Sequence, residues 1–248
     1  VIEEIGSEVS LFKIGDRVTH ASMPIGAYSE KQIMQEDKLI SVPDGVSDEV
    51  ASCITLKGIT AEYLLHRAYP LKKGDKILYH AAAGALGQIL CPWANALGAV
   101  VIGTVGSKAK EEIAKKNGCH HVINYSEKDF VKEVEKIVGK NSVDVVYDGV
   151  GTKTFKGSIE TLKIRGMMVA FGNASGYVDT LDIKKDINAK GLFFTRPSIA
   201  HYTVKREELV ESAKKVFDAI LTKKFTVEIS KKYSLKDAAQ AHKDLEAR

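Results

Sequence analysis

The stretch Lys76-Ile-Leu-Tyr-His80-Ala-Ala-Ala-Gly84-Ala-Leu-Gly87 decides the fold of this chain. An apolar, strand-like run passes directly into a turn of small residues and then into a helical pattern, which is typical of the phosphate-binding turn of a dinucleotide fold. Small residues matter there because they let a pyrophosphate approach the backbone N–H groups at the start of the helix. The alternative interpretation of these residues is an ordinary strand-to-helix turn that binds no phosphate. No Gly-Lys-Ser/Thr follows, so the pattern does not favour a nucleoside triphosphate loop.

Short apolar runs recur after this point, separated by amphipathic stretches long enough for one helix each. The six runs cover residues 77–81, 100–105, 122–125, 143–147, 167–171 and 192–195. Helical patterns at 108–117 and 127–138 end at glycines, which supply the left-handed residue that closes a helix. Alternating strands and helices with right-handed crossovers predict an α/β fold, a Rossmann doubly wound parallel sheet of six strands.

The flanking segments carry different patterns. Residues 1–45 contain short β-rich pieces and turns, and residues 47–68 are helical in pattern with a break expected near Gly58. After Pro197, two amphipathic helices at 206–222 and 235–247 enclose one strand-like stretch at 225–229.

Composition limits the classes of function. The 36 Lys/Arg and 32 Asp/Glu residues are spread through the 248-residue chain, so no polybasic patch predicts nucleic-acid binding. No run approaches the roughly 18 apolar residues that a membrane span needs. Three cysteines without a Cys-x-x-Cys pair fit the reduced thiols of a cytoplasmic protein. Because the chain begins at Val1, as if inside a strand, we expect its natural N-terminus to lie upstream.

The end of the second strand, Gly103-Thr-Val-Gly106-Ser107-Lys108-Ala-Lys110, decides which cofactor we expect. An acidic residue here would bond the ribose 2′-hydroxyl of NAD, and its absence also argues against a methyltransferase that uses S-adenosylmethionine. A serine hydroxyl and two lysines instead suit the 2′-phosphate of NADPH. Lysines in a first helical turn oppose the helix dipole, so an anionic ligand explains them better than helix stability does. The alternative explanation is that the two lysines lie at a solvated helix start and bind no ligand.

Eight segments together resemble one family. They are Gly45-Val-Ser, Leu56-Lys-Gly-Ile-Thr60-Ala-Glu-Tyr63-Leu-Leu, residues 80–87, Gly103-Thr-Val, His121-Val-Ile-Asn-Tyr125, Val146-Tyr-Asp148-Gly-Val-Gly151, Phe171-Gly-Asn173-Ala-Ser-Gly176 and Thr195-Arg-Pro197. In this order they are similar to the NADPH:quinone oxidoreductases of the zeta-crystallin type, which are zinc-free members of the medium-chain dehydrogenase/reductase superfamily. The chain departs from that family at Ala85-Leu86, where Gly-Val is usual, and at Pro92, where glutamine is common.

The resemblance implies two domains in a chain that is cut short at both ends. Residues 1–55 would be the C-terminal part of a GroES-like, β-rich catalytic domain, and residues 56–198 would be the NADP-binding Rossmann domain. Residues 199–248 would return to the catalytic domain as helices and one strand. Family members pair through the last strand of the sheet, so we expect a cytoplasmic homodimer.

The resemblance also implies the cofactor-binding residues. Thr60 would sit beside the nicotinamide, residues 84–87 would take the pyrophosphate, and Arg248 would return to a cofactor phosphate. The full set is Thr60, Gly84, Ala85, Leu86, Gly87, Gly106, Ser107, Lys110, Tyr125, Gly149, Val150, Gly151, Phe171, Gly172, Asn173, Phe194, Thr195, Arg196 and Arg248. We expect no metal, because residues 19–35 hold no cysteine and Lys57 falls near the place of a catalytic zinc ligand in zinc alcohol dehydrogenases.

The activity that the resemblance implies is hydride transfer from NADPH to a quinone, with the protein supplying position and excluding water. No residue is assigned as a catalytic acid, base or nucleophile. Two alternatives stay open. One is an enone or 2-alkenal reductase of the same superfamily, and the other is a non-catalytic, NADPH-binding crystallin or RNA-binding protein.

Overall fold

The computed structural model describes residues 1–21 and 24–247, and the chain divides into two compact units. One unit comprises Val1–Leu56 together with Val227–Arg248, and the other comprises Lys57–Thr226. The larger unit contains every predicted cofactor-binding residue except Arg248, which lies outside the described residues.

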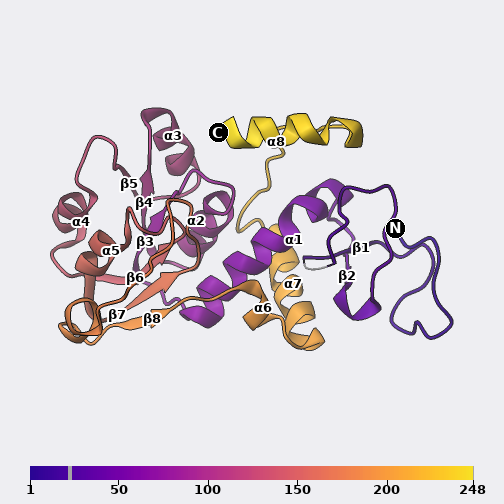
Figure 1. The fold of residues 1–248 in the computed structure, drawn as a ribbon, viewed down its shortest axis with the longest axis horizontal. Coiled ribbons are helices and arrows are strands. Elements are labelled where there is room, and N and C mark those ends of the chain that lie inside the picture. The colour runs from indigo at the N-terminus through magenta and orange to yellow at the C-terminus, as the bar shows by residue number, and fades with distance from the viewer. Residues whose placement is uncertain (22–23, 248) are drawn as a thin grey trace. The chain divides into compact units, whose positions relative to one another are not determined.

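A six-stranded parallel sheet forms the centre of the larger unit (Figure 1). Its strand order is β5-β4-β3-β6-β7-β8. The strands are β3 (Lys76–His80), β4 (Val100–Val105), β5 (His121–Asn124), β6 (Val143–Asp148), β7 (Leu162–Ala170) and β8 (Phe193–Thr195). The predicted doubly wound parallel sheet is therefore confirmed. The largest difference is β7, which begins at Leu162 and crosses a register shift opposite β6.

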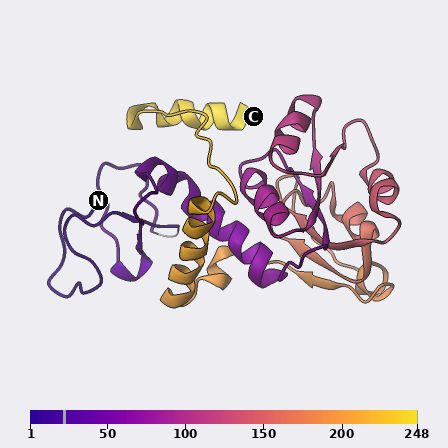
Figure 2. The same ribbon diagram turned by 180° about the vertical axis from the view of Figure 1, so that it is seen from behind.

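Helices connect these strands and cover both faces of the sheet. Figures 1 and 2 show α4 and α5 on one side of the sheet and α2 on the other. The helical elements of this unit are α1 (Asp48–Tyr63, from Lys57 on), η2 (Leu64–Ala68), α2 (Gly87–Ala96), α3 (Lys108–Lys116), α4 (Phe130–Val138), α5 (Phe155–Thr161), η3 (Ile183–Asn188), α6 (Ile199–Tyr202) and α7 (Arg206–Leu221). Helix α4 shows why these segments are helical: the Asp129 side chain caps its first N–H groups, and Gly139 ends it at φ 90°.

Helix α1 runs from Asp48 to Tyr63 without interruption, so the break expected near Gly58 is wrong. Buried neighbours such as Ile54 and Ile59, both 0% exposed, stabilise the helix and outweigh the low helical propensity of glycine. The irregularity comes one turn later, where Leu64–Ala68 forms a π-helical turn.

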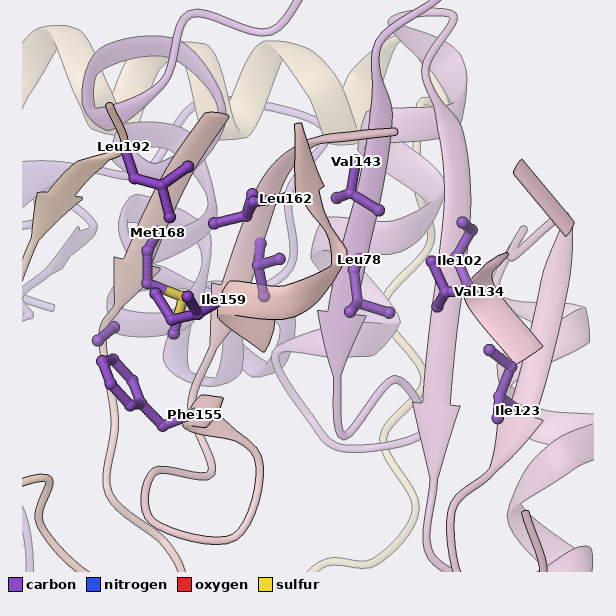
Figure 3. Packing of buried hydrophobic residues seen from close by; sticks show 12 residues of the cluster. Leu78, Ile102, Ile123, Val134, Val143, Phe155, Ile159, Leu162, Met168 and Leu192 are labelled. Carbon is purple, nitrogen blue, oxygen red and sulfur yellow. The ribbon is translucent and has the colours of Figure 1, made fainter. Parts of the chain in front are cut away.

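The core beneath α4 and α5 is a continuous cluster of apolar side chains (Figure 3). Met168 and Ala170 of β7 both contribute to it, because residues two positions apart in a strand point to the same face. Its fully or nearly fully buried members include Leu78, Ile102, Ile123, Val134, Val143, Phe155, Ile159, Leu162, Met168 and Leu192. This packing holds the carboxyl ends of the strands in fixed relative positions.

Substitution of Leu162 by alanine is expected to lower the free energy of unfolding by about 2–5 kcal/mol, because Leu162 is 0% exposed and its removal leaves a cavity. Urea unfolding measures the loss. Ile164→Ala, on the same strand but 69% exposed, is the control and should change stability by less than about 0.5 kcal/mol. Equal losses in the two variants would contradict this picture of the core.

The strand predicted at residues 225–229 and the domain boundary predicted at residue 198 both differ from the structure. The structure has no strand at residues 225–229, so the predicted strand is wrong. Phe225 is buried against Trp93, with ring centroids 5.4 Å apart, and this contact accounts for the first apolar position in the pattern. The larger unit extends to Thr226, past the predicted boundary at 198, because α7 packs against α1: the Ser212 hydroxyl donates to Glu62 Oε2 at 2.5 Å.

The smaller unit has little regular structure. Strands β1 (Val18–Thr19) and β2 (Ile40–Ser41) form an antiparallel pair. Its helical elements are η1 (Glu36–Lys38), the first half of α1, η4 (Leu235–Asp237) and α8 (Ala238–Ala247).

Candidate cofactor site

The candidate site lies where the strand order of the sheet reverses. From β3 the chain passes outward to β4 and β5, and it then crosses to β6 on the other side of β3 and continues to β7 and β8. In doubly wound sheets, ligands bind in the crevice beyond the carboxyl ends of the strands at this point. Most of the predicted cofactor-binding residues follow these carboxyl ends, so the fold brings them to one edge of the sheet.

The turn after β3 has a strained backbone. Ala81 adopts a left-handed conformation with φ 63°, and the Gly84 N–H donates to the Ala81 carbonyl at 2.8 Å. A left-handed conformation costs a residue other than glycine about 1–2 kcal/mol. Such strain persists where the surrounding structure over-determines the backbone, and it clusters at ligand sites.

The start of α2 packs closely on this turn. A Cβ atom on Gly87 would lie 2.3 Å from the carbonyl oxygen of Ala82, so only glycine fits there. Ala82 is itself fully buried, and its N–H donates to the Thr104 carbonyl at 2.9 Å. The first N–H groups of a helix have no partner inside it. Because Gly84 and Ala85 are exposed, an anion such as a pyrophosphate can reach this helix start.

Three side chains that can donate hydrogen bonds lie at the turn after β4. Ser107 is the N-cap residue of α3, yet its hydroxyl makes no capping hydrogen bond. Tyr125, which follows β5 and is 40% exposed, places its hydroxyl against Gly106, since a Cβ there would lie 2.8 Å from Tyr125 Oη. Lys110 is exposed in the first turn of α3. These donors fit the 2′-phosphate of NADPH.

Backbone hydrogen bonds connect the loop after β6 to the loop after β7. The Ala174 N–H donates to the Gly149 carbonyl at 3.2 Å, and the Ser175 N–H donates to the Val150 carbonyl at 2.7 Å. These bonds place two groups of predicted residues side by side, Gly149, Val150 and Gly151 after β6 and Phe171, Gly172 and Asn173 after β7.

The predicted nicotinamide wall comes from β8 and α1. Phe194 is 38% exposed and stands edge-on to Phe155, with centroids 6.2 Å apart, and Arg196 follows exposed after the strand. Thr195 and Thr60 are half-buried. The structure thus places all the predicted residues within residues 57–226, apart from Arg248, and their contact with a cofactor stays a prediction.

Tyr63, one turn after Thr60 on α1, lies in a segment that carries the family resemblance but is not among the predicted cofactor-binding residues. It is 2% exposed and stacks on Tyr202 of α6, with ring centroids 4.5 Å apart. Burial raises the pKa of Tyr63 to about 12, so its phenol keeps its proton at neutral pH.

A buried polar cluster beneath the site was missed entirely by the sequence analysis. His80, the last residue of β3, contacts the Thr104 hydroxyl through Nδ1 at 2.8 Å and the Ser158 hydroxyl through Nε2 at 2.9 Å. The Ser158 hydroxyl lies 3.1 Å from Asp148 Oδ2. The only sequence signal was that His80 and Asp148 both stand at strand ends, in runs otherwise rich in apolar residues.

Asp148 is a buried carboxylate that is held by neutral donors. Its Oδ1 accepts the N–H groups of Val150 at 2.8 Å and Gly151 at 3.0 Å. Its Oδ2 accepts the Thr154 hydroxyl at 2.7 Å. The carboxylate thereby shapes the loop after β6 directly.

Burial lowers the pKa of His80, and the nearby charge of Asp148 opposes this shift in part. In the unfolded chain the pKa of histidine is about 6.5. Below that pH the unfolded state binds a proton that folded His80 does not, so the stabilisation present above about pH 6.5 is lost as pH falls toward the folded pKa. The stability advantage of the unmodified protein over His80→Gln should therefore shrink between pH 7.5 and pH 5.5 in urea unfolding. A constant difference would contradict a neutral buried His80.

The part of the chain that the structure describes has neither a group of metal-ligating side chains nor a membrane-spanning helix. Within residues 1–21 and 24–247, no three His, Cys, Asp or Glu side chains are grouped so that they could hold a metal ion. In the same described part of the chain, none of the helices has the length and apolar composition that a membrane crossing requires.

Comparisons with known proteins agree with this geometry. The profile of the family described as "Zinc-binding dehydrogenase" matches residues 85–221. The chain is 45% identical over 246 residues to the 2-haloacrylate reductase of Burkholderia sp, covering 98% of this chain and 74% of that protein. It is 43% identical over 251 residues to quinone oxidoreductase 1 of Escherichia coli (strain K12), covering 100% of this chain and 76% of that protein. The crystal structure of Escherichia coli quinone oxidoreductase complexed with NADPH superposes with a TM-score of 0.94 over 99% of this chain and 76% of that one, at 43% identity.

Proposed function

Since this chain belongs to the quinone oxidoreductases of the medium-chain dehydrogenase/reductase superfamily, we propose that it transfers a hydride from NADPH to a quinone. Its cofactor is NADPH, which when bound supplies the hydride from its nicotinamide ring. The observation that carries the choice of cofactor is the turn after β4, where a serine hydroxyl free of capping and a first-turn lysine stand in place of a carboxylate.

The residues of this chain act by binding and positioning. The start of α2 at Gly87 holds the pyrophosphate, and Ser107, Lys110 and Tyr125 hold the 2′-phosphate and the adenine side. Phe194 covers part of the nicotinamide wall and excludes water from it. A fixed geometry of this kind lowers the barrier by orienting the reactants before they react. We assign no residue of the chain as proton donor.

A second acceptor class is favoured by one observation, the 45% identity to a 2-haloacrylate reductase. That protein's name describes reduction of a conjugated carboxylate. An enone or 2-alkenal acceptor needs the same cofactor and the same hydride geometry, so the two candidates differ only in the acceptor pocket.

The test is NADPH oxidation, followed at 340 nm, with 1,2-naphthoquinone, a 2-alkenal and 2-chloroacrylate as separate acceptors. We expect the highest kcat/KM with the quinone. A higher value with either conjugated alkene would replace the quinone with that acceptor class. Tight NADPH binding without turnover on any acceptor would favour the non-catalytic alternative.

We further propose a cytoplasmic homodimer. Strand β8 is at the edge of the sheet and pairs only with β7 among the described strands, and Phe193 on it is 59% exposed. An exposed strand edge with an apolar side chain is a surface suited to pairing with a second copy. Free thiols at Cys53, Cys91 and Cys119 support a reducing compartment. Sedimentation of the protein should give a dimer, and Phe193→Glu should shift it toward monomer.

A further inference from the structure

Four buried side chains form a continuous hydrogen-bonded chain that joins three strand ends. They are Thr104 of β4, His80 of β3, Ser158 of α5 and Asp148 of β6, and we call them the strand-end chain. None of the four is more than 1% exposed. The chain crosses the switch point of the sheet, since β3 pairs with β4 on one side and with β6 on the other.

The acceptors at one end set the direction of the hydrogen bonds. The Ser158 hydroxyl lies 2.9 Å from the Thr154 carbonyl and 3.1 Å from Asp148 Oδ2, and neither oxygen can donate. The single hydroxyl hydrogen of Ser158 therefore points to one of them, and Ser158 Oγ accepts from His80. His80 then carries its hydrogen on Nε2, and its Nδ1 accepts from the Thr104 hydroxyl.

Each strand end in the chain leads directly into a predicted cofactor-binding loop. His80 precedes the strained Ala81 of the turn after β3. The Thr104 carbonyl accepts the N–H of Ala82 in that same turn, and Thr104 itself comes two residues before Gly106. Asp148 accepts two N–H groups of the loop after β6. A shift at any member would therefore reach the loops for the pyrophosphate, the ribose and the nicotinamide.

We propose that the strand-end chain positions these three loops, and that His80 takes part as the neutral tautomer with its hydrogen on Nε2. The proposal rests on the proposed function and names positioning residues for it. Stability alone does not account for the chain, because buried polar and charged groups are often replaced by well-packed apolar residues without loss of stability. A fully satisfied polar network instead fixes one geometry.

The tautomer of His80 is measured directly by ¹⁵N chemical shifts of the imidazole, with its signals assigned by their loss in His80→Gln. We expect the Nε2–H form in the unmodified protein. In Ser158→Ala, Nε2 loses its acceptor while Nδ1 keeps the Thr104 hydroxyl oxygen, so His80 should change to the Nδ1–H form. An Nδ1–H form in the unmodified protein, or no change in Ser158→Ala, would overturn the proposed direction of the chain.

The positioning role is measured by NADPH binding, followed by nicotinamide fluorescence, alongside thermal unfolding. Asp148→Ala removes the acceptor for two loop N–H groups and should raise the Kd for NADPH about tenfold or more. Asp148→Asn keeps an oxygen in the place of Oδ1 and should restore binding to within about threefold. Ile159→Val, next to Ser158 on α5 but outside the chain, is the control and should leave Kd unchanged.

The outcomes separate this proposal from the proposed function. If the unmodified protein does not bind NADPH, both fail together. If it binds NADPH and reduces a quinone while Asp148→Ala binds equally well, the positioning role alone fails. If Asp148→Asn is as defective as Asp148→Ala, the oxygen that accepts the loop N–H groups is not the determinant, and the positioning role fails in the same way.

Discussion

Replacement of Gly87 by alanine is expected to abolish NADPH binding at concentrations that saturate the unmodified protein. The added Cβ would lie 2.3 Å from the carbonyl oxygen of Ala82 and 2.7 Å from its carbonyl carbon. These are backbone atoms of a fully buried residue that is bonded to β4, so they cannot move aside. The start of α2 must shift instead, and its N–H groups leave the position that a pyrophosphate requires. Equilibrium titration with NADPH fluorescence measures the effect.

Two other glycines serve as controls for Gly87→Ala. A Cβ on Gly84 would meet only the Ala81 carbonyl oxygen, at 3.0 Å, so Gly84→Ala should keep the thermal stability of the protein while weakening NADPH binding about tenfold. A Cβ on Gly6 would meet nothing within 4 Å, and Gly6→Ala should change neither quantity. Full NADPH binding by Gly87→Ala would show that the pyrophosphate does not lie at the start of α2.

The second large effect is expected from Ser107→Asp combined with Lys110→Ala. A carboxylate at the N-cap of α3 would stand beside the 2′-phosphate, and the loss of Lys110 removes an opposite charge. Two like charges about 4 Å apart near a protein surface repel by about 4 kcal/mol at most, which corresponds to about 1000-fold in affinity, so the Kd for NADPH should rise between about 100-fold and that limit. The same carboxylate can bond the ribose 2′-hydroxyl, so NADH should bind more tightly than before.

The fold should tolerate the exchange at Ser107, because aspartate is as good an N-cap residue as serine. Ser107→Asn with Lys110→Ala is the matched control, since asparagine caps equally well but carries no charge. It should weaken NADPH binding by no more than about tenfold and should leave NADH binding unchanged. If the aspartate and asparagine variants behave alike, the repulsion argument is wrong.

The sheet could be predicted from the sequence because its strands are buried on both faces. A buried parallel strand is a short run of apolar residues, and such runs at helix-length intervals leave little choice of fold. Residues 225–229 show the limit of that argument. Their alternation resembles a strand, but Phe225 is buried against Trp93 without any strand to pair with, a contact between residues more than 100 positions apart.

The candidate site could be predicted only in part, because sequence patterns reveal local structure and not contacts between distant segments. The turn after β3 and the turn after β4 are each formed by consecutive residues, so their glycines, serine and lysines can be recognised in the sequence. The strand-end chain is not local: His80 and Ser158 are 78 positions apart, and nothing in either segment indicates the other. The left-handed conformation of Ala81 could not be predicted from its residue type either, because that conformation is normally adopted by glycine.

A paired titration of the unmodified protein with NADPH and with NADH, under one set of buffer and salt conditions, tests directly whether the turn after β4 selects the 2′-phosphate. We expect NADPH to bind at least about 100-fold more tightly, because only NADPH carries the phosphate that we propose Ser107, Lys110 and Tyr125 bind. Equal dissociation constants for the two cofactors would contradict it.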